Sequence, residues 1–354
     1  MSAERVDIYL RAHTEKVRDS EKEKKPRSTK QDKALPDRFP PHALIVDTET
    51  RVDVHQRLMF GIYRVCKLVD GQYRTEKEGV VYSSFSEISH LSYAAVLEKK
   101  ELNSIGSFVL NTFPDIELKY FPPRTRLEVH QSFPDFMTKV FWPAVRKGWL
   151  CTFFNAPFDL SRLSCDWRPM RRKRGFSLVL SKQLEHKSQT WIPHPYRPEI
   201  RIEPKDARTA FIKRGVPRFR KDEWPNPARF LDLSTLLFSL FDKHMSLDNW
   251  AAEFRKKGYK IDRKIEHEPS GRVTQDELKY CAGDVKTTLQ LLNAGLQEFS
   301  RHPLPSLLPD FSYSPASVAK AYMHEMGIVR PMKKFNVPSE INGIAMQAYF
   351  GGRA

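Results

Sequence analysis

The stretch "ALIVDTET" at residues 43–50 decides how the rest of the sequence is interpreted. Its apolar residues predict a buried strand, which runs directly into Asp47, Thr48 and Glu49. Residues two apart in a strand project from the same face, so the two carboxylates project together. They repel each other unless a cation lies between them. A polar turn after an ordinary strand is the plainer interpretation, and the rest of the chain has to decide between the two.

The chain as a whole has the length and composition of a folded protein. Its 354 residues are enough for one large domain with appendages or for two domains, and 40% of them are hydrophobic. No apolar run approaches the roughly 20 residues of a membrane span, and the N-terminus lacks the apolar core of a secretory signal. The four scattered cysteines argue against a disulfide framework and a cysteine-ligated zinc site. We therefore expect an intracellular protein, cytoplasmic or, for a gene on an organellar plasmid, mitochondrial.

Positive charge is concentrated in residues 162–221, which contain 17 Lys and Arg residues but only 5 Asp and Glu residues. The net charge of the whole chain is +16, which suits a polyanionic partner such as nucleic acid. Aromatic residues are interleaved with these cations: Trp167, Phe176, Trp191, Tyr196, Phe211 and Phe219. Aromatic rings stack on bases while cations meet phosphates, so this basic insertion is interpreted as a contact for single-stranded nucleic acid. A solvated basic surface is the alternative.

Apolar periodicity and turn residues predict mixed secondary structure after a charged tail, residues 1–40, that is expected to be disordered. The predicted elements, in chain order, are strands at 42–50, 58–68 and 78–84, a helix at 132–149, a strand at 150–155, a helix that includes residue 157, a strand and turn at 228–241, and helices at 246–258 and 274–299. Ser132, Ser246 and Thr274 are the expected N-caps, the last in a capping box with Glu277. Three early strands followed by alternating helices and strands predict an α/β (α+β mixed sheet) fold with flanking helices.

Three short motifs place carboxylates at element ends. The first is Asp47-Thr48-Glu49. The second, "NAPFD" at residues 155–159, lies where a strand turns into a helix and ends in Asp159. The third, "YCAGD" at residues 280–284, puts Tyr280 and Asp284 one turn apart on one face of a helix. Each motif alone has a structural explanation as a turn, a cap or a surface pair. Together they predict a site for Mg²⁺ or Mn²⁺, which prefer carboxylate oxygens.

The motifs Asp-x-Glu, Asn-x-x-Phe-Asp and Tyr-x-x-x-Asp, in this order, resemble the three exonuclease motifs of the DEDD superfamily, and the tyrosine marks its DEDDy branch. More narrowly, the sequence is similar to the proofreading domain of family B DNA polymerases of the protein-primed phage and linear-plasmid type. The approach "VTQDELKYCAGDV" and the tail "AYFGGR" fit that group, so the resemblance runs from residue 43 to the end. The polymerase motifs expected after this tail are absent, which predicts a chain truncated before the polymerase region.

The resemblance implies an RNase H-like 3′→5′ exonuclease fold at residues 41–300, with the basic insertion at 162–221. Residues 301–354 would be a linker and the start of the polymerase region. The implied metal ligands for two Mg²⁺ or Mn²⁺ ions are Asp47, Glu49, Asp159 and Asp284. Tyr280 would orient the attacking water.

Further roles are implied for residues around these ligands. Asn155 and Phe158 would hold the 3′-terminal strand, with Thr48 as an additional substrate contact. The family also uses a lysine between the second and third motifs; Lys257, Lys260 and Lys264 all compete for this role, and Lys260 is the working assignment.

The expected partner is the 3′ end of single-stranded DNA or a primer–template, with a terminal protein as a further partner of this polymerase type. We expect a monomer that does not engage a membrane. Two other functions stay open: a catalytically silent polymerase remnant that binds DNA, and a DEDD exonuclease that trims RNA. A comparison of DNA and RNA oligonucleotides separates the last from the first.

Overall fold

A computed structural model describes most of the chain. The described residues are 15–16, 38–84, 94–117, 119–121, 126–170, 175–185, 187–204, 210–214, 229–263, 266–305 and 307–329. Several predictions lie outside them: the disorder of most of the N-terminal tail, the aromatic contact at Phe219, the role of Lys264 and the tail "AYFGGR". Within the described ranges, no helix combines the length and the apolar character that a membrane crossing requires.

The chain divides into two compact units. One comprises residues 36–317, and the other combines residues 1–35 with residues 318–354. In the second unit, strand β1 (Glu15–Lys16) pairs antiparallel with strand β14 (Ile328–Val329), and helix α8 (Pro315–Glu325) leads into it. All of the motif residues belong to the first unit.

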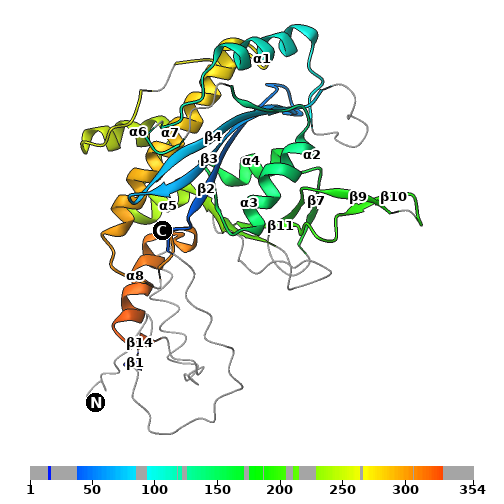
Figure 1. The fold of residues 1–354 in the computed structure, drawn as a ribbon. Coiled ribbons are helices and arrows are strands. Elements are labelled where there is room, and N and C mark those ends of the chain that lie inside the picture. The colour runs from blue at the N-terminus through cyan, green and yellow to red at the C-terminus, as the bar shows by residue number, and fades with distance from the viewer. Residues whose placement is uncertain are drawn as a thin grey trace, which may run out of the picture. The chain divides into compact units, whose positions relative to one another are not determined.

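A six-stranded mixed sheet forms the centre of the first unit (Figure 1). Its strands are β2 (His42–Thr50), β3 (Leu58–Val69), β4 (Gln72–Tyr82), β5 (Glu128–His130), β6 (Leu150–Phe153) and β13 (Arg229–Asp232). Their order across the sheet is β13-β6-β2-β3-β4-β5. The antiparallel meander of β2, β3 and β4 is confirmed, whereas β6 and β13 extend the sheet in parallel. The predicted mixed α/β architecture is therefore confirmed.

Helices cover both faces of this sheet (Figure 1). They are α1 (Lys99–Asn111), α2 (Phe133–Phe136), a π-helical turn (Met137–Phe141), α3 (Trp142–Arg146), α4 (Ala156–Arg162), α5 (Leu233–Phe241), α6 (Leu247–Lys256) and α7 (Gln275–Ser300). Helices α2 to α4 pack on the face that receives Leu44 and Val46 of β2, where they bury Phe133 and Phe141. Helix α7 lies on the opposite face, and α1, α5 and α6 pack against it. Because side chains alternate along β2, Asp47 projects toward α7.

The basic insertion folds into β-structure of its own. Its strands are β7 (Asp166–Pro169), β8 (Phe176–Val179), β9 (Lys182–Glu185), β10 (Thr190–Pro193), β11 (Ile200–Pro204) and β12 (Ala210–Arg214). They form a four-stranded sheet in the order β12-β11-β8-β7 and a separate β9–β10 hairpin. Ile200 and Ile202 are buried on the inner face, which joins the core beneath α2 and α3.

Three helix starts agree with the sequence. The side chains of Ser132, Ser246 and Thr274 each accept a hydrogen bond from a backbone N–H in the first turn, as N-caps do. The capping box is only half formed, because the Glu277 carboxylate accepts from the backbone N–H of Ser270 at 2.5 Å and from its hydroxyl at 2.7 Å. Glu277 is therefore drawn away from the helix end that it was expected to cap.

Other predicted elements are wrong in their bounds or type. Strand β4 begins six residues before the predicted 78–84, because Tyr73 and Thr75 alternate inward among charged neighbours and pair with the end of β3. The turn predicted within 228–241 is helix α5; Asp232 ends β13 and accepts a hydrogen bond from Thr235 in its first turn. The helix predicted at 132–149 is present as a continuous helical segment from residue 133 to residue 146, with a π-helical turn at residues 137–141. The largely apolar residues 229–241 contain both β13 and α5, and such a run does not show by its hydrophobicity where a strand ends and a helix begins.

Candidate metal centre

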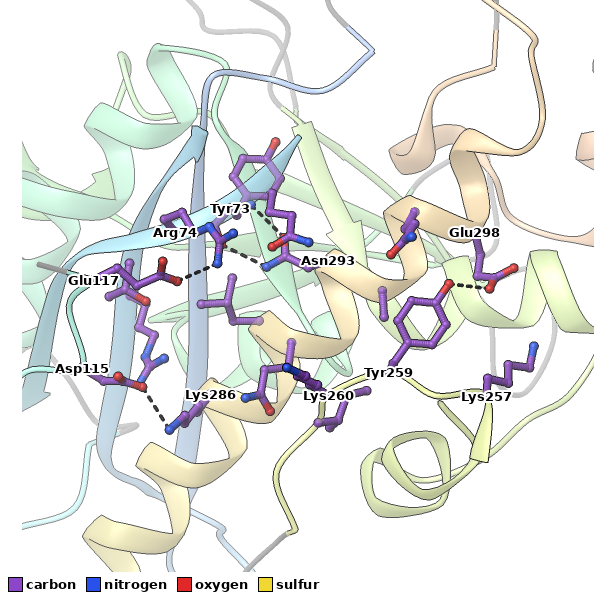
Figure 2. A pocket seen from close by; sticks show the side chains of 18 of the residues that line it. Tyr73, Arg74, Asp115, Glu117, Lys257, Tyr259, Lys260, Lys286, Asn293 and Glu298 are labelled. Atoms are coloured by element: carbon purple, nitrogen blue, oxygen red, sulfur yellow. Dashed lines mark hydrogen bonds and ion pairs between the residues drawn. The ribbon is translucent and has the colours of Figure 1, made fainter. Parts of the chain in front are cut away.

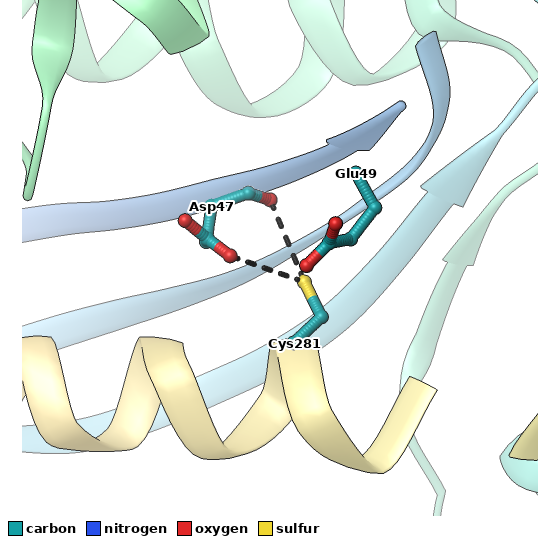
Figure 3. Close-up of side chains that lie close together, drawn as sticks. All are labelled: Asp47, Glu49 and Cys281. Carbon is teal, nitrogen blue, oxygen red and sulfur yellow. Dashed lines mark hydrogen bonds between the residues drawn. The ribbon is translucent and has the colours of Figure 1, made fainter. Parts of the chain in front are cut away.

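The carboxyl end of β2 meets the N-terminal half of α7. Ligand atoms of Asp47, Glu49 and Cys281 all lie within 4.8 Å of one another. Figure 3 shows the two carboxylates projecting from β2 toward the thiol on α7, where the Cys281 Sγ donates to the Asp47 carboxylate at 3.5 Å. Asp284 follows Cys281 by one turn of α7 and is 8% exposed. The alternation predicted for Asp47 and Glu49 therefore brings both carboxylates to one place, facing a helix that carries a third.

Asp159 reaches the same strand end from its edge. Strand β6 pairs with β2 only as far as Ile45 and ends at Phe153, so the edge of β2 beyond that point has no strand beside it. The Asp159 Oδ1 fills this position: it accepts from the Thr48 backbone N–H at 3.1 Å and from the Thr48 hydroxyl at 2.7 Å. Both side chains are buried. Thr48 was predicted to contact the substrate; here its hydroxyl holds a carboxylate, and the substrate contact stays a prediction.

The start of α4 presents the other second-motif residues. Pro157 lies in the first turn, as predicted, and the Asn155 carbonyl accepts from the backbone N–H groups of Phe158 and Asp159. The Asn155 side chain makes no capping hydrogen bond and is exposed. The Phe158 ring is half-buried, with the Arg162 guanidinium 4.9 Å from its centroid. Asn155 and Phe158 therefore offer an amide and an aromatic face beside the buried Asp159.

The electrostatics show that the motif carboxylates share one field. Burial, followed by the charges of Asp47, Glu277, Asp284 and Asp159, raises the pKa of Glu49 to about 9. Burial and then the charge of Asp47 raise the pKa of Asp159, against the opposing effect of its hydrogen bonds from Thr48. A proton is thus held more tightly wherever several carboxylates are buried together without a cation.

A metal ion is a natural counter-charge for this group. The ligand atoms of Asp47, Glu49 and Cys281 are close enough together to surround one metal ion. Burial and the charge of Asp47 raise the pKa of the Cys281 thiol well above its usual value, so the sulfur stays protonated at neutral pH and is a poor metal ligand. The remaining donors are carboxylate oxygens, which fit a hard divalent cation. The chemistry of the donor set therefore fits the kind of ion that the sequence predicted.

Glu277 is a fifth acidic residue at this site, and the sequence analysis assigned it only to a cap. It is 1% exposed and its charge acts on Glu49. Glu277, Cys281 and Asp284 have the spacing i, i+4, i+7, so all three share one face of α7. This periodicity in the sequence could have predicted that Glu277 belongs to the site. The His267 Nε2 lies 3.4 Å from its carboxylate, and the His267 ring centroid lies 5.3 Å from that of the half-buried Tyr280.

The loop that carries His267 is fastened beside the strand end. The Arg51 guanidinium donates to Glu101 at 2.5 Å and to the Gly271 carbonyl at 2.8 Å. Gly271 has φ +69°, and a Cβ added there would meet the Cγ2 of Val52 at 2.9 Å. A glycine is therefore required both by the left-handed backbone and by this close approach.

Two sequence-predicted contacts lie away from the carboxylates. Lys260 lines a separate cleft beside the C-terminal half of α7, whose lining includes none of the four motif carboxylates, so its catalytic role stays a prediction. In the basic insertion, Trp167, Trp191 and Tyr196 are 65%, 42% and 41% exposed, as a stacking surface would require. The other described aromatics of that segment are half-buried. The Phe211 ring packs against the Tyr313 ring, with 4.4 Å between the ring centroids.

In comparisons with known proteins, no family model and no curated protein match this chain.

Proposed function

We propose that this chain is the N-terminal part of a family B DNA polymerase and carries a metal-dependent 3′→5′ exonuclease with an RNase H-like fold. The observation that supports the proposal is the convergence of the three motifs. Asp47, Asp159 and Asp284 come from distant parts of the sequence, yet each contributes to the raised pKa of Glu49. Unrelated polar turns and surface pairs have no reason to meet in this way.

The sheet supports the same assignment. Within its six strands, β3 alone runs antiparallel to the others, and β2 lies near the middle. The carboxylates lie at the carboxyl end of β2, beside the point where β6 turns into α4. Crevices at such strand ends commonly bind ligands in sheets that contain parallel strands.

In the proposed site, Asp47, Glu49 and Asp284, assisted by Asp159, would hold two Mg²⁺ or Mn²⁺ ions. When bound, these ions supply a lowered pKa for a bound water and stabilisation of the negative charge that develops in an in-line displacement. Tyr280, on α7 one turn before Asp284, would orient the water by a hydrogen bond. A tyrosine hydroxyl is ordinarily protonated at neutral pH, which suits it to orienting rather than to accepting a proton.

The substrate would be the 3′ end of a single DNA strand. The exposed Asn155 amide and the half-buried Phe158 ring would hold the terminal nucleotide, and the exposed aromatics and cations of the insertion would contact the strand behind it. A new bond forms between the water oxygen and phosphorus while the bond from phosphorus to the 3′ oxygen breaks. The products are a nucleoside 5′-monophosphate and a strand with a new 3′-hydroxyl.

A 5′-labelled single-stranded oligodeoxynucleotide tests the proposal. With Mg²⁺ or Mn²⁺, the chain is expected to shorten it from the 3′ end, and Asp284→Asn to abolish shortening while leaving binding intact. Asp276→Asn is the matched control, because Asp276 is an exposed aspartate in the first turn of the same helix. Absence of wild-type shortening with either ion contradicts the catalytic proposal. Faster shortening of an RNA oligonucleotide of the same sequence would replace DNA by RNA as the substrate.

A further inference from the structure

A large polar cleft lies along the C-terminal half of α7, separate from the carboxylate site. Its volume is about 940 Å³, and it is bounded by β3, β4, α7 and the segment that follows α6 (Figure 2). Lys286, Gln290 and Asn293 line it from α7 with the spacing i, i+4, i+7, so they form one face of that helix. Asp284 and Asn293 are nine residues apart, about 14 Å along the helix axis. One helix thus serves two sites on two faces.

The acidic residues of this cleft are already neutralised. Asp115 lies 3.2 Å from the Lys286 Nζ and 3.3 Å from the Arg64 guanidinium. Glu117 pairs with Arg74 at 2.9 Å. Figure 2 shows Asp115 and Lys286 joined in this way.

The third acidic residue of the lining is neutralised in the same manner. Glu298 pairs with Arg301 at 2.9 Å and accepts from the Tyr259 hydroxyl at 2.5 Å. The floor of the cleft is therefore polar but nearly neutral, and its excess charge has to come from cations that have no carboxylate beside them.

Two lysines supply that excess. Lys257 and Lys260 line the cleft and are exposed, and neither forms an ion pair within the described part of the chain. The Lys257 Nζ lies 3.8 Å from the centroid of the Phe241 ring, so a cation–π contact positions this ammonium without neutralising it. Gly258, with φ +89° just after the end of α6, turns the chain so that both lysines reach the same cleft.

The surrounding sequence increases this positive charge. The stretch "RKKGYKIDR" at residues 255–263 contains three cations besides Lys257 and Lys260, against one aspartate, and that aspartate pairs with Lys286 at 3.0 Å. Arg263 and Lys256 are exposed in the segment that follows and ends α6, and the Lys256 Nζ lies 3.9 Å from the Glu253 carboxylate. A ligand that carries negative charges in a row matches cations displayed along an open groove.

We propose that this cleft binds the phosphate backbone of a nucleic acid, with Lys257 and Lys260 as phosphate contacts. The inference goes beyond the proposed hydrolysis and does not depend on it. It also gives Lys260 a role that its position supports. The cleft that Lys260 lines contains none of the motif carboxylates, so a catalytic contact has no partner there.

Fluorescence anisotropy with a labelled single-stranded oligonucleotide, in EDTA so that no divalent-ion-dependent cleavage occurs, tests the inference. For single strands, the slope of log affinity against log salt is about 0.7 per neutralised phosphate, because each contact releases counterions. At about 0.1 M salt, one phosphate contact therefore increases the affinity roughly 5-fold. Lys257→Ala with Lys260→Ala should therefore weaken binding roughly 25-fold and reduce the slope of log affinity against log salt by about 1.4. Lys260→Arg should retain wild-type affinity, because a cation remains.

The matched control is Lys99→Ala with Lys100→Ala, an adjacent pair of exposed lysines at the start of α1 outside the cleft. An equal loss in both double variants, or no loss in the cleft variant, overturns the inference. The same measurement with a labelled duplex shows which form of nucleic acid the cleft binds. If the cleft variant binds both the single strand and the duplex more weakly, the lysines contact the backbone of either form. If only binding of the single strand is weakened, the cleft is a single-strand site. Competition by poly-glutamate as strong as that by an oligonucleotide of equal charge would overturn the choice of nucleic acid.

Because the binding assay contains no divalent ion, its outcome is independent of nuclease activity. A chain that shortens DNA but shows unchanged binding in the cleft variant keeps the proposed function and loses this inference. A chain without nuclease activity whose cleft variant binds roughly 25-fold more weakly keeps this inference and loses the proposed function.

Discussion

Thr48→Val separates two roles for the threonine between the carboxylates of the first motif. Valine has nearly the same shape as threonine but lacks the hydroxyl, which lies 2.7 Å from the Asp159 Oδ1. The hydrogen bond from the Thr48 backbone N–H at 3.1 Å remains. Since both side chains are buried, water cannot replace the lost donor. An ordinary hydrogen bond within a protein contributes about 0.5–1.5 kcal/mol, so the free energy of unfolding should fall by about that amount.

The same substitution should act on catalysis through Asp159. The Thr48 hydrogen bonds lower the pKa of Asp159 against the stronger effect of burial, so removal of one raises that pKa further and weakens the carboxylate as a ligand. A displacement of about 1 Å in a reacting group can cost roughly 100-fold in rate. We therefore expect kcat for shortening of a single strand to fall by roughly 10–100-fold while KM is unchanged.

Urea unfolding and steady-state kinetics measure the two effects. Thr48→Ser, which keeps the hydroxyl, should restore kcat, and Thr152→Val is the matched control, since that buried threonine makes only a 3.4 Å bond to a backbone carbonyl of its own strand. A raised KM with unchanged kcat would refute the positioning role and favour the direct substrate contact predicted from the sequence. Unchanged stability would refute the hydrogen bond itself.

Two further predictions concern buried charged residues at the two ends of β13. The Arg229 guanidinium, 3% exposed, binds the Asp310 carboxylate through two nitrogens, and Asp310→Ala leaves it without that carboxylate. The free energy of unfolding should fall by about 3–5 kcal/mol. A loss below about 1 kcal/mol in urea unfolding would contradict this prediction. Burial raises the pKa of Asp232 from 3.8 to about 6, so the folded state binds the proton more tightly than the unfolded state, and stability is lost as pH rises through about 4 to 6. Asp232→Asn should remove up to roughly 3 kcal/mol of this loss, seen as a flatter dependence of unfolding free energy on pH; parallel curves for both proteins would contradict it.

Helix α7 borders both the carboxylate site and the cleft. One of its faces brings Cys281 to the end of β2, with Asp284 one turn later acting on the pKa of Glu49, and another face lines the cleft. A strand bound at both places would extend along this helix. Under the two proposals, the carboxylate site and the cleft would act on the same nucleic acid, with the cleft contributing affinity and the carboxylates contributing chemistry.

The sequence alone determined the features that depend on local periodicity. Alternation along residues 42–50 placed Asp47 and Glu49 on one face, and four-residue spacing placed Tyr280 with Asp284, because the backbone geometry of a strand or helix sets these directions by itself. The caps at Ser246 and Thr274 were predictable for the same reason: they satisfy N–H groups within one turn.

Tertiary structure alone decided which distant groups share one environment. The position of Asp159 depends on where β6 stops beside β2, which leaves the Thr48 N–H for a carboxylate to bind. The position of Lys260 depends on how the chain leaves α6, which directs it to a cleft rather than to the carboxylates. Glu277 could be assigned to a cap by its spacing, but burial and the proximity of Ser270 gave it a different partner. Such outcomes follow from packing between elements, where burial and charge act across space and not along the chain.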